Sequence, residues 1–160
     1  TFSPQRYEIW TMQSSWHNLP EFEPESAQYQ QQPGLEFAAR DVAVSDALDA
    51  ITMDIAPAYG AVPGLGFYRR RVQLSANGLT LQEETDFSRT VALTLMSVEK
   101  PAVEGGAVQF GTLAAAHIKG FARIATEAVP ITDPRLRQAW PDTLYRTRIC
   151  FTGALTVEVQ

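Results

Sequence analysis

Hydrophobic and polar residues alternate in short runs along most of the chain, and apolar residues at helical spacing are almost absent. Alternation with a period of two is typical of strands that bury one face. We expect strands over residues 6–13, 15–20, 36–42, 47–55, 67–74, 79–85, 90–98, 108–113, 121–129, 144–151 and 155–159. Since no helices separate these runs, the pattern predicts an all-β fold, a two-layer antiparallel β-sandwich of about eleven strands.

At most one short helix is expected, from Asp133 to Ala139, with Asp133 as the N-cap and Pro134 in the first helical position. Two longer loops interrupt the strand pattern. One holds the glutamine-rich stretch Gln28 to Gln32, and the other runs from Pro57 to Gly66.

The dipeptide Asn77-Gly78 predicts a hairpin in which these two residues form the turn. Counting outward from that turn places Arg70 opposite Thr85 and on the apolar face of the hairpin. An inward arginine needs a partner, and Glu83 is one diagonal step away. We favour a structural ion pair between Arg70 and Glu83; the alternative is that Arg70 binds an anionic ligand at the open end of the sheet.

The 160 residues are enough for one domain with a substantial core. A net charge of −5 argues against a surface that attracts nucleic acid overall, and no apolar run approaches the roughly 20 residues of a membrane helix. The single cysteine, Cys150, excludes an internal disulfide and is expected to be a buried thiol. The chain begins at Thr1 and not at methionine, so we expect a piece of a longer protein, whose localisation stays open.

Only two histidines are present, and the usual motifs of phosphate loops, paired cysteines and nucleophile elbows are missing. His117 has no nearby carboxylate and is expected to be an ordinary surface or packed residue. His17 lies among aromatic residues on a predicted strand, where it shares a face with Ser15 and Leu19. Composition alone favours a structural role for His17, with a ligand or catalytic role as the alternative.

The chain also carries the run Arg6-Tyr7-x-Ile9-Trp10-x-Met12-Gln13-Ser14-x-x-His17-Asn18-Leu19-Pro20, followed by Gln31-x-x-Gly34-x-x-Phe37-x-Ala39. Weaker matches follow in Tyr68-x-Arg70-x-Val72-x-Leu74 with its Asn77-Gly78 turn, and in Trp140-x-x-x-Leu144-Tyr145-Arg146. Together these segments, which span nearly the whole chain, resemble the C-terminal β-sandwich of heparinase II/III-like polysaccharide lyases. The first run is the more specific part of the resemblance.

Such lyases join an α/α-toroid, which carries most of the substrate groove, to a large β-sandwich, and they cleave uronic-acid-containing polysaccharides by β-elimination. The reaction needs a base, an acid and neutralisation of the uronate carboxylate. The family places these groups mostly upstream of the region seen here. The resemblance therefore implies that residues 1–160 form a single β-sandwich domain, a C-terminal fragment without the toroid, with no catalytic residue and no activity alone. Its implied partner is an acidic polysaccharide, bound through the missing toroid, and not nucleic acid or a membrane.

The resemblance further implies a zinc ion in the intact protein, held by His17 together with a histidine and an aspartate from outside this chain. Asn18 would be a neighbour of that site, and Arg6, Tyr7 and Asn18 are the implied substrate-binding residues. The isolated fragment is expected to bind zinc weakly or not at all. The stretch from Phe22 to Tyr29 is longer and more acidic than the matching loop of the family.

Two other functions are compatible with the sequence. A freestanding carbohydrate-binding sandwich would stack sugar rings on Trp10, Trp16 or Tyr59. A structural or oligomer-forming module would instead present a continuous apolar patch on one sheet.

Overall fold

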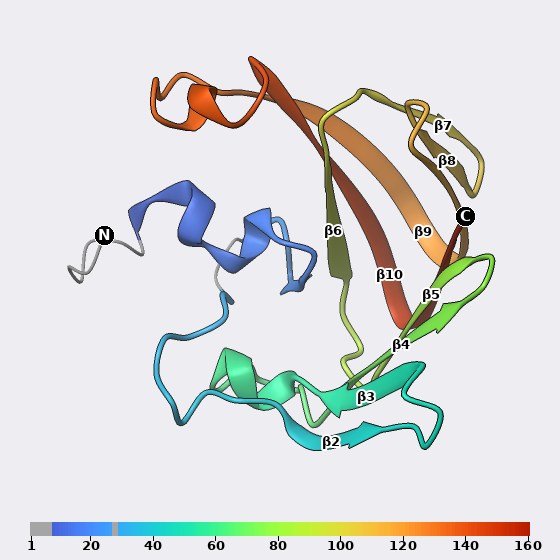
Figure 1. Cartoon of the computed structure of the whole chain (residues 1–160). Helices are drawn as coiled ribbons and strands as arrows, with labels where there is room; N and C mark the ends of the chain where they lie inside the picture. The colour runs from blue at the N-terminus through green and yellow to red at the C-terminus, as the bar shows by residue number, and fades with distance from the viewer. Residues whose placement is uncertain (1–7, 27–28) are drawn as a thin grey trace.

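The structure of the chain is a computed structural model that describes residues 8–26 and 29–160. This part of the chain confirms the all-β prediction, with ten strands and no helix longer than four residues. Figure 1 shows a strongly bent sheet with the N-terminal segment lying across one side. The strands are β1 (Pro20–Phe22), β2 (Arg40–Val44), β3 (Ala50–Asp54), β4 (Tyr68–Ser75), β5 (Gly78–Thr85), β6 (Val91–Ser97), β7 (Pro101–Glu104), β8 (Ala107–Phe110), β9 (Ala114–Pro130) and β10 (Thr143–Val159).

The strand order is β2-β3-β4-β5-β10-β9-β8-β7, and all pairs are antiparallel. The long strand β10 pairs with β9 on one edge and is shared by two strands on the other. Residues 145–151 of β10 pair with β6, which also pairs with β1, whereas residues 154–159 pair with β5. Because β5 and β6 pair with different parts of β10, the sheet divides at this strand into the two layers of the sandwich (Figure 1).

The bend between the layers coincides with register shifts in the β9–β10 pair near Phe151. Gly120 lies at this bend with a φ of 85°, and a Cβ there would be 2.5 Å from the carbonyl oxygen of Ala154. A residue with a side chain would therefore be strained both in its backbone and in its contact with β10. The close approach of the two long strands requires glycine at this position.

The core lies between the layers and is centred on aromatic rings. Phe22 of β1 contacts Tyr68 of β4, with ring centroids 5.6 Å apart, and Phe87 at 5.2 Å. All three side chains are at most 1% exposed. Burial of each large apolar side chain stabilises the fold by roughly 1.5–3 kcal/mol, so these contacts are a major part of what holds the layers together.

Most predicted strands are confirmed, although the residues at which they begin and end are shifted. The predicted strands 144–151 and 155–159 are one continuous strand, β10, and β7 was not predicted. The predicted strands 6–13 and 15–20 are wrong in the described residues. The chain instead forms the 3₁₀ turns η2 (Trp10–Met12) and η3 (Ser14–Trp16).

The packing of two tryptophans explains these turns. Residues six apart in a strand are separated by about 20 Å, whereas the rings of Trp10 and Trp16 are 4.9 Å apart. Both rings pack against a small apolar cluster formed by Val129, Ile131 and Leu144. A compact backbone is needed to bring both indoles to that cluster.

The β4–β5 hairpin forms as predicted, but its register differs by two residues. The turn is Ala76-Asn77, and Gly78 already pairs with Ser75 as the first residue of β5. A Cβ on Gly78 would lie 1.9 Å from the carbonyl oxygen of Val159, so this glycine is needed for the approach of β10 and not for the turn. Arg70 therefore lies directly opposite Glu83, and not opposite Thr85.

The expected helix over residues 133–139 is reduced to the 3₁₀ turn η5 (Leu136–Gln138). The carboxylate of Asp133 accepts a hydrogen bond from the backbone N–H of Arg135 at 2.8 Å, which resembles the predicted cap. A further 3₁₀ turn, η4 (Ala56–Tyr59), lies after β3, so short helical turns are more numerous than expected. None of the helical turns in residues 8–26 and 29–160 has the length and apolar character required to cross a bilayer.

Candidate functional site

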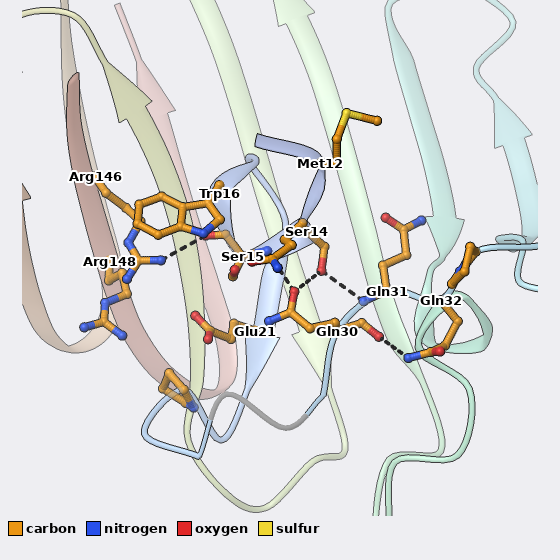
Figure 2. A pocket seen from close by; sticks show the side chains of 13 residues that line it. Met12, Ser14, Ser15, Trp16, Glu21, Gln30, Gln31, Gln32, Arg146 and Arg148 are labelled. Carbon is orange, nitrogen blue, oxygen red and sulfur yellow. Dashed lines mark hydrogen bonds between the residues drawn. The ribbon is translucent and has the colours of Figure 1, made fainter. Parts of the chain in front are cut away.

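The N-terminal segment and the glutamine-rich loop form one layer over the outer face of β6 and β10. The hydroxyl of Ser14 links them, because it donates to Oε1 of Gln30 at 2.8 Å and accepts from the backbone N–H of Gln31 at 2.9 Å. The backbone N–H of Ser15 also donates to Oε1 of Gln30, at 3.2 Å. Segments that are sixteen residues apart are thereby held as one surface (Figure 2).

A cleft of about 510 Å³ opens between this surface and the sheet. The residues that give it chemical character come from three elements: Trp16 from η3, Glu21 from β1, and Arg146 and Arg148 from β10, together with Gln30 of the loop. Figure 2 shows these side chains around the cleft. Its volume is within the range of roughly 300–1,000 Å³ that is usual for small-molecule sites.

Glu21 is the most unusual residue of the cleft. Its neighbours Pro20 and Phe22 face the other side of the strand, with Phe22 in the core, so the alternation of β1 directs Glu21 toward the outer face. The residue is only 4% exposed, and its carboxylate has no hydrogen bond or ion pair with any residue that the structure describes, with Oε2 fully buried. Burial raises the pKa of this carboxyl group, and the positive charges of Arg146 and Arg148 only partly oppose the rise.

The two arginines of the cleft differ in the hydrogen bonds and ion pairs that they make. Arg146 pairs with Glu127 of β9, donates to the backbone oxygen of Ser15 at 3.3 Å, and stacks over the ring of Trp16 at 4.1 Å. Arg148 is half-buried and forms neither a hydrogen bond nor an ion pair within the described residues. The cleft therefore contains one guanidinium group that is available to a ligand.

His17 lies in a shallower depression next to this cleft, which shares Met12, Ser14 and Gln31 with it. Its side chain is exposed, and Nε2 is 3.1 Å from the backbone oxygen of Thr11. Because a carbonyl oxygen only accepts hydrogen bonds, Nε2 is the donor in this contact, and a neutral ring that makes it has the lone pair on Nδ1. A histidine that is oriented by a backbone carbonyl and has one free nitrogen is well suited to bind a metal.

His17 could supply only one zinc ligand. Within residues 8–26 and 29–160, no group of three or more histidine, cysteine, aspartate or glutamate side chains is placed to hold an ion. Since zinc takes about four ligands, a zinc site at His17 would need ligands from outside the described residues, and the zinc ion remains a prediction.

The other residues singled out from the sequence have separate positions. Asn18 is exposed; its backbone oxygen accepts from Arg70 at 2.9 Å, and its Oδ1 accepts from the backbone N–H of Met96 at 3.3 Å. Asn18 lines a groove other than the Glu21 cleft, and its role in substrate binding remains a prediction. Arg6 and Tyr7 are outside the described residues. His117 is exposed on β9, as expected.

Three aromatic residues that could stack on sugar rings, Trp10, Trp16 and Tyr59, do not form a flat platform together. Tyr59 is only 3% exposed, and its hydroxyl donates to the backbone oxygen of Pro20 at 2.6 Å. The rings of Trp10 and Trp16 are inclined by 71°, and the guanidinium of Arg146 covers Trp16. The prediction that Tyr59 could stack on a sugar is wrong, because this side chain belongs to the core.

Glu21 and Arg148 were not identified from the sequence. Glu21 fell between a predicted strand that ended at residue 20 and a predicted loop that began at residue 22. The sequence pattern that could have identified Glu21 is an acidic residue between two apolar ones, which is typical of a strand with one polar position.

No family model and no curated protein sequence matches the chain. The geometry of the site and the resemblance in the sequence are therefore the basis for a function.

Proposed function

We propose that the chain is the C-terminal β-sandwich of a heparinase II/III-like polysaccharide lyase. In the intact protein it would supply one zinc ligand and part of the wall of the cleft for a uronic-acid-containing polysaccharide, and alone it would be inactive. The proposal is supported by the way the chain brings the segments of the resemblance together. Ser14 of the first run bonds to Gln31 of the second, and Asn18 of the first run bonds to Arg70 of the third.

The observation that carries the proposal is the orientation of His17. Its exposed ring donates through Nε2 to the oxygen of Thr11, so Nδ1 faces away from that bond with a free lone pair. When bound, the metal would cross-link the sandwich to the neighbouring part of the protein that provides the other ligands.

The lining of the Glu21 cleft is consistent with a supporting role in the reaction. β-Elimination needs a base for the C5 proton and an acid for the leaving oxygen. No tyrosine or histidine is among the described residues that line the cleft. In this proposal the base and the acid come from another part of the intact protein, as the resemblance implies, and this chain binds and orients the substrate.

The metal content of the full-length protein tests the proposal. His17→Ala should lose most of the zinc that the unmodified protein contains, since one of three protein ligands is removed. His117→Ala is the matched control, because His117 is also an exposed histidine but lies on β9. Zinc that is unchanged in His17→Ala would contradict the assignment of a half-site.

A further inference from the structure

Three polar groups at the same cleft make no hydrogen bond with the described residues: the carboxylate of Glu21, the NH₂ group of Gln30 and the guanidinium of Arg148. Glu21 is only 4% exposed, its Oε2 is fully buried, and its carboxylate makes no hydrogen bond or ion pair inside the described part of the chain. Arg148 forms no hydrogen bond or ion pair there, although its charge acts on the carboxyl group of Glu21. Oε1 of Gln30 accepts hydrogen bonds from the hydroxyl of Ser14 and the backbone N–H of Ser15, so the NH₂ group of Gln30 is the part that can donate to a ligand.

We propose that this cleft binds a ligand through a carboxylate group, which pairs with Arg148, accepts from the amide of Gln30, and shares a proton with Glu21. Glu21 is a buried polar group that makes no hydrogen bond to a described residue, which is costly, whereas Arg148 and Gln30 are half-buried. A ligand that bonds to Glu21 removes that cost and adds a charge-assisted contact with Arg148, so it gains more than an exposed ion pair would provide. The proposal rests on the proposed function and deepens it, since it names the chemical group of the substrate that this cleft would bind and the residues that would bind it.

The preference for a carboxylate over other anions follows from the shared proton. Burial raises the pKa of the Glu21 carboxyl group, so this group can be neutral and donate its O–H to the ligand. A carboxylate is a good acceptor for that proton, since its own affinity for protons is similar to that of glutamate. A sulfate group is a much poorer base and would have only Arg148 and Gln30 as donors.

The charged groups that act on Glu21 come from β10, β9 and the loop after β1, and none comes from its neighbour β6. They are Arg146 and Arg148 on β10, Glu127 on β9 and Glu25 in the loop after β1. Arg146 is already paired with Glu127, and Glu25 with Arg123, so Arg148 is the group whose charge is free for a ligand.

At a pH above the raised pKa of Glu21, binding would therefore take up one proton from solvent for each ligand bound. The affinity should fall as pH rises through the raised pKa of Glu21, by up to about tenfold per pH unit, which is the limit for one proton. Glu21→Gln, which is permanently neutral and can donate through its amide, should bind with little dependence on pH.

The test uses this chain and three soluble probes: a uronic acid monosaccharide, the corresponding neutral sugar and inorganic sulfate. Binding is followed by ¹H–¹⁵N NMR at millimolar probe and at several pH values. We expect the uronate to shift the side-chain amide of Gln30, and the neutral sugar to leave it unchanged. Sulfate should bind more weakly than the uronate and without the pH dependence.

Three variants decide the outcome. Arg148→Met should weaken uronate binding at least tenfold, because a charge-assisted contact is lost. Arg135→Met, at an exposed position outside the cleft, should bind like the unmodified chain. The proposal is overturned if the uronate does not shift Gln30, if Arg148→Met binds normally while Arg135→Met does too, or if Glu21→Gln abolishes binding. Each of these results leaves the zinc content of His17→Ala untouched, so the two proposals can fail separately.

Discussion

Arg70 of β4 and Glu83 of β5 lie directly opposite each other, and their side chains form an ion pair on the inward face of the hairpin. Nε of Arg70 donates to Oε1 of Glu83 at 2.8 Å, and Nη1 donates to the backbone oxygen of Asn18 at 2.9 Å. The Glu83 side chain is 0% exposed and that of Arg70 only 11%. This pair therefore joins the hairpin to the N-terminal segment, next to the residue proposed to bind zinc.

Removal of Arg70 should be strongly destabilising. Arg70→Ala leaves the carboxylate of Glu83 buried without its partner, which typically costs about 3–5 kcal/mol. The adjacent Arg69 is a matched control, because it pairs with Glu84 on the exposed face, where both side chains are more than half exposed. Arg69→Ala should cost no more than about 1 kcal/mol. Urea unfolding of both variants checks the difference, and equal losses would show that the Arg70–Glu83 pair has no special role.

The placement of Arg70 shows what the sequence could predict. The residue was placed on the inward face although the predicted register was wrong by two residues. A shift of two residues leaves every side chain on the same face of a strand, whereas a shift of one would have inverted the hairpin. The prediction that Glu83 is the partner of Arg70 was therefore robust, but the true turn depends on the contact of Gly78 with Val159, which is distant in sequence.

The N-terminal segment shows where local pattern fails. Its alternating residues predicted strands, but the packing of Trp10 and Trp16 on one cluster required 3₁₀ turns. The cleft could not be predicted from the sequence either. Glu21 and Arg148 are 127 residues apart, and they come to line one cleft only because β1 pairs with β6 and β6 with β10. His17 could be singled out because it is one of two histidines within a distinctive run.

Glu21 should make the stability of the chain depend on pH. Its pKa is higher in the folded state than the ordinary value of 4.5, so the folded state binds more protons than the unfolded state between the two values. Stability is therefore greatest below the unfolded pKa and falls as pH rises through the folded pKa. Glu21→Gln cannot ionise and should show a flatter profile in this window. Urea unfolding of both proteins from pH 4 to pH 8 checks this, and parallel profiles would contradict the assignment of a raised pKa.

Ser14 should hold the loop that forms one wall of the cleft. Ser14→Ala removes one bond to Gln30 and one to Gln31, and we expect a loss of about 1–3 kcal/mol in stability. Hydrogen exchange at the amide of Gln31 should also become faster, because its acceptor is lost. Ser75→Ala is a suitable control, since Ser75 is exposed and lies at the β4–β5 turn. Unchanged exchange at Gln31 in Ser14→Ala would show that the loop is held by other contacts.

The central claim is that this chain belongs to a lyase that acts on acidic polysaccharides. The most direct test is to incubate the full-length protein, and separately the chain of residues 1–160, with a panel of uronic-acid-containing polysaccharides. The double bond that β-elimination creates in the product is followed by ultraviolet absorbance. The account predicts that the full-length protein forms this unsaturated product from at least one of the polysaccharides and that the isolated chain forms none. Product formation by the isolated chain, or its absence with the full-length protein on every polysaccharide, would contradict the account.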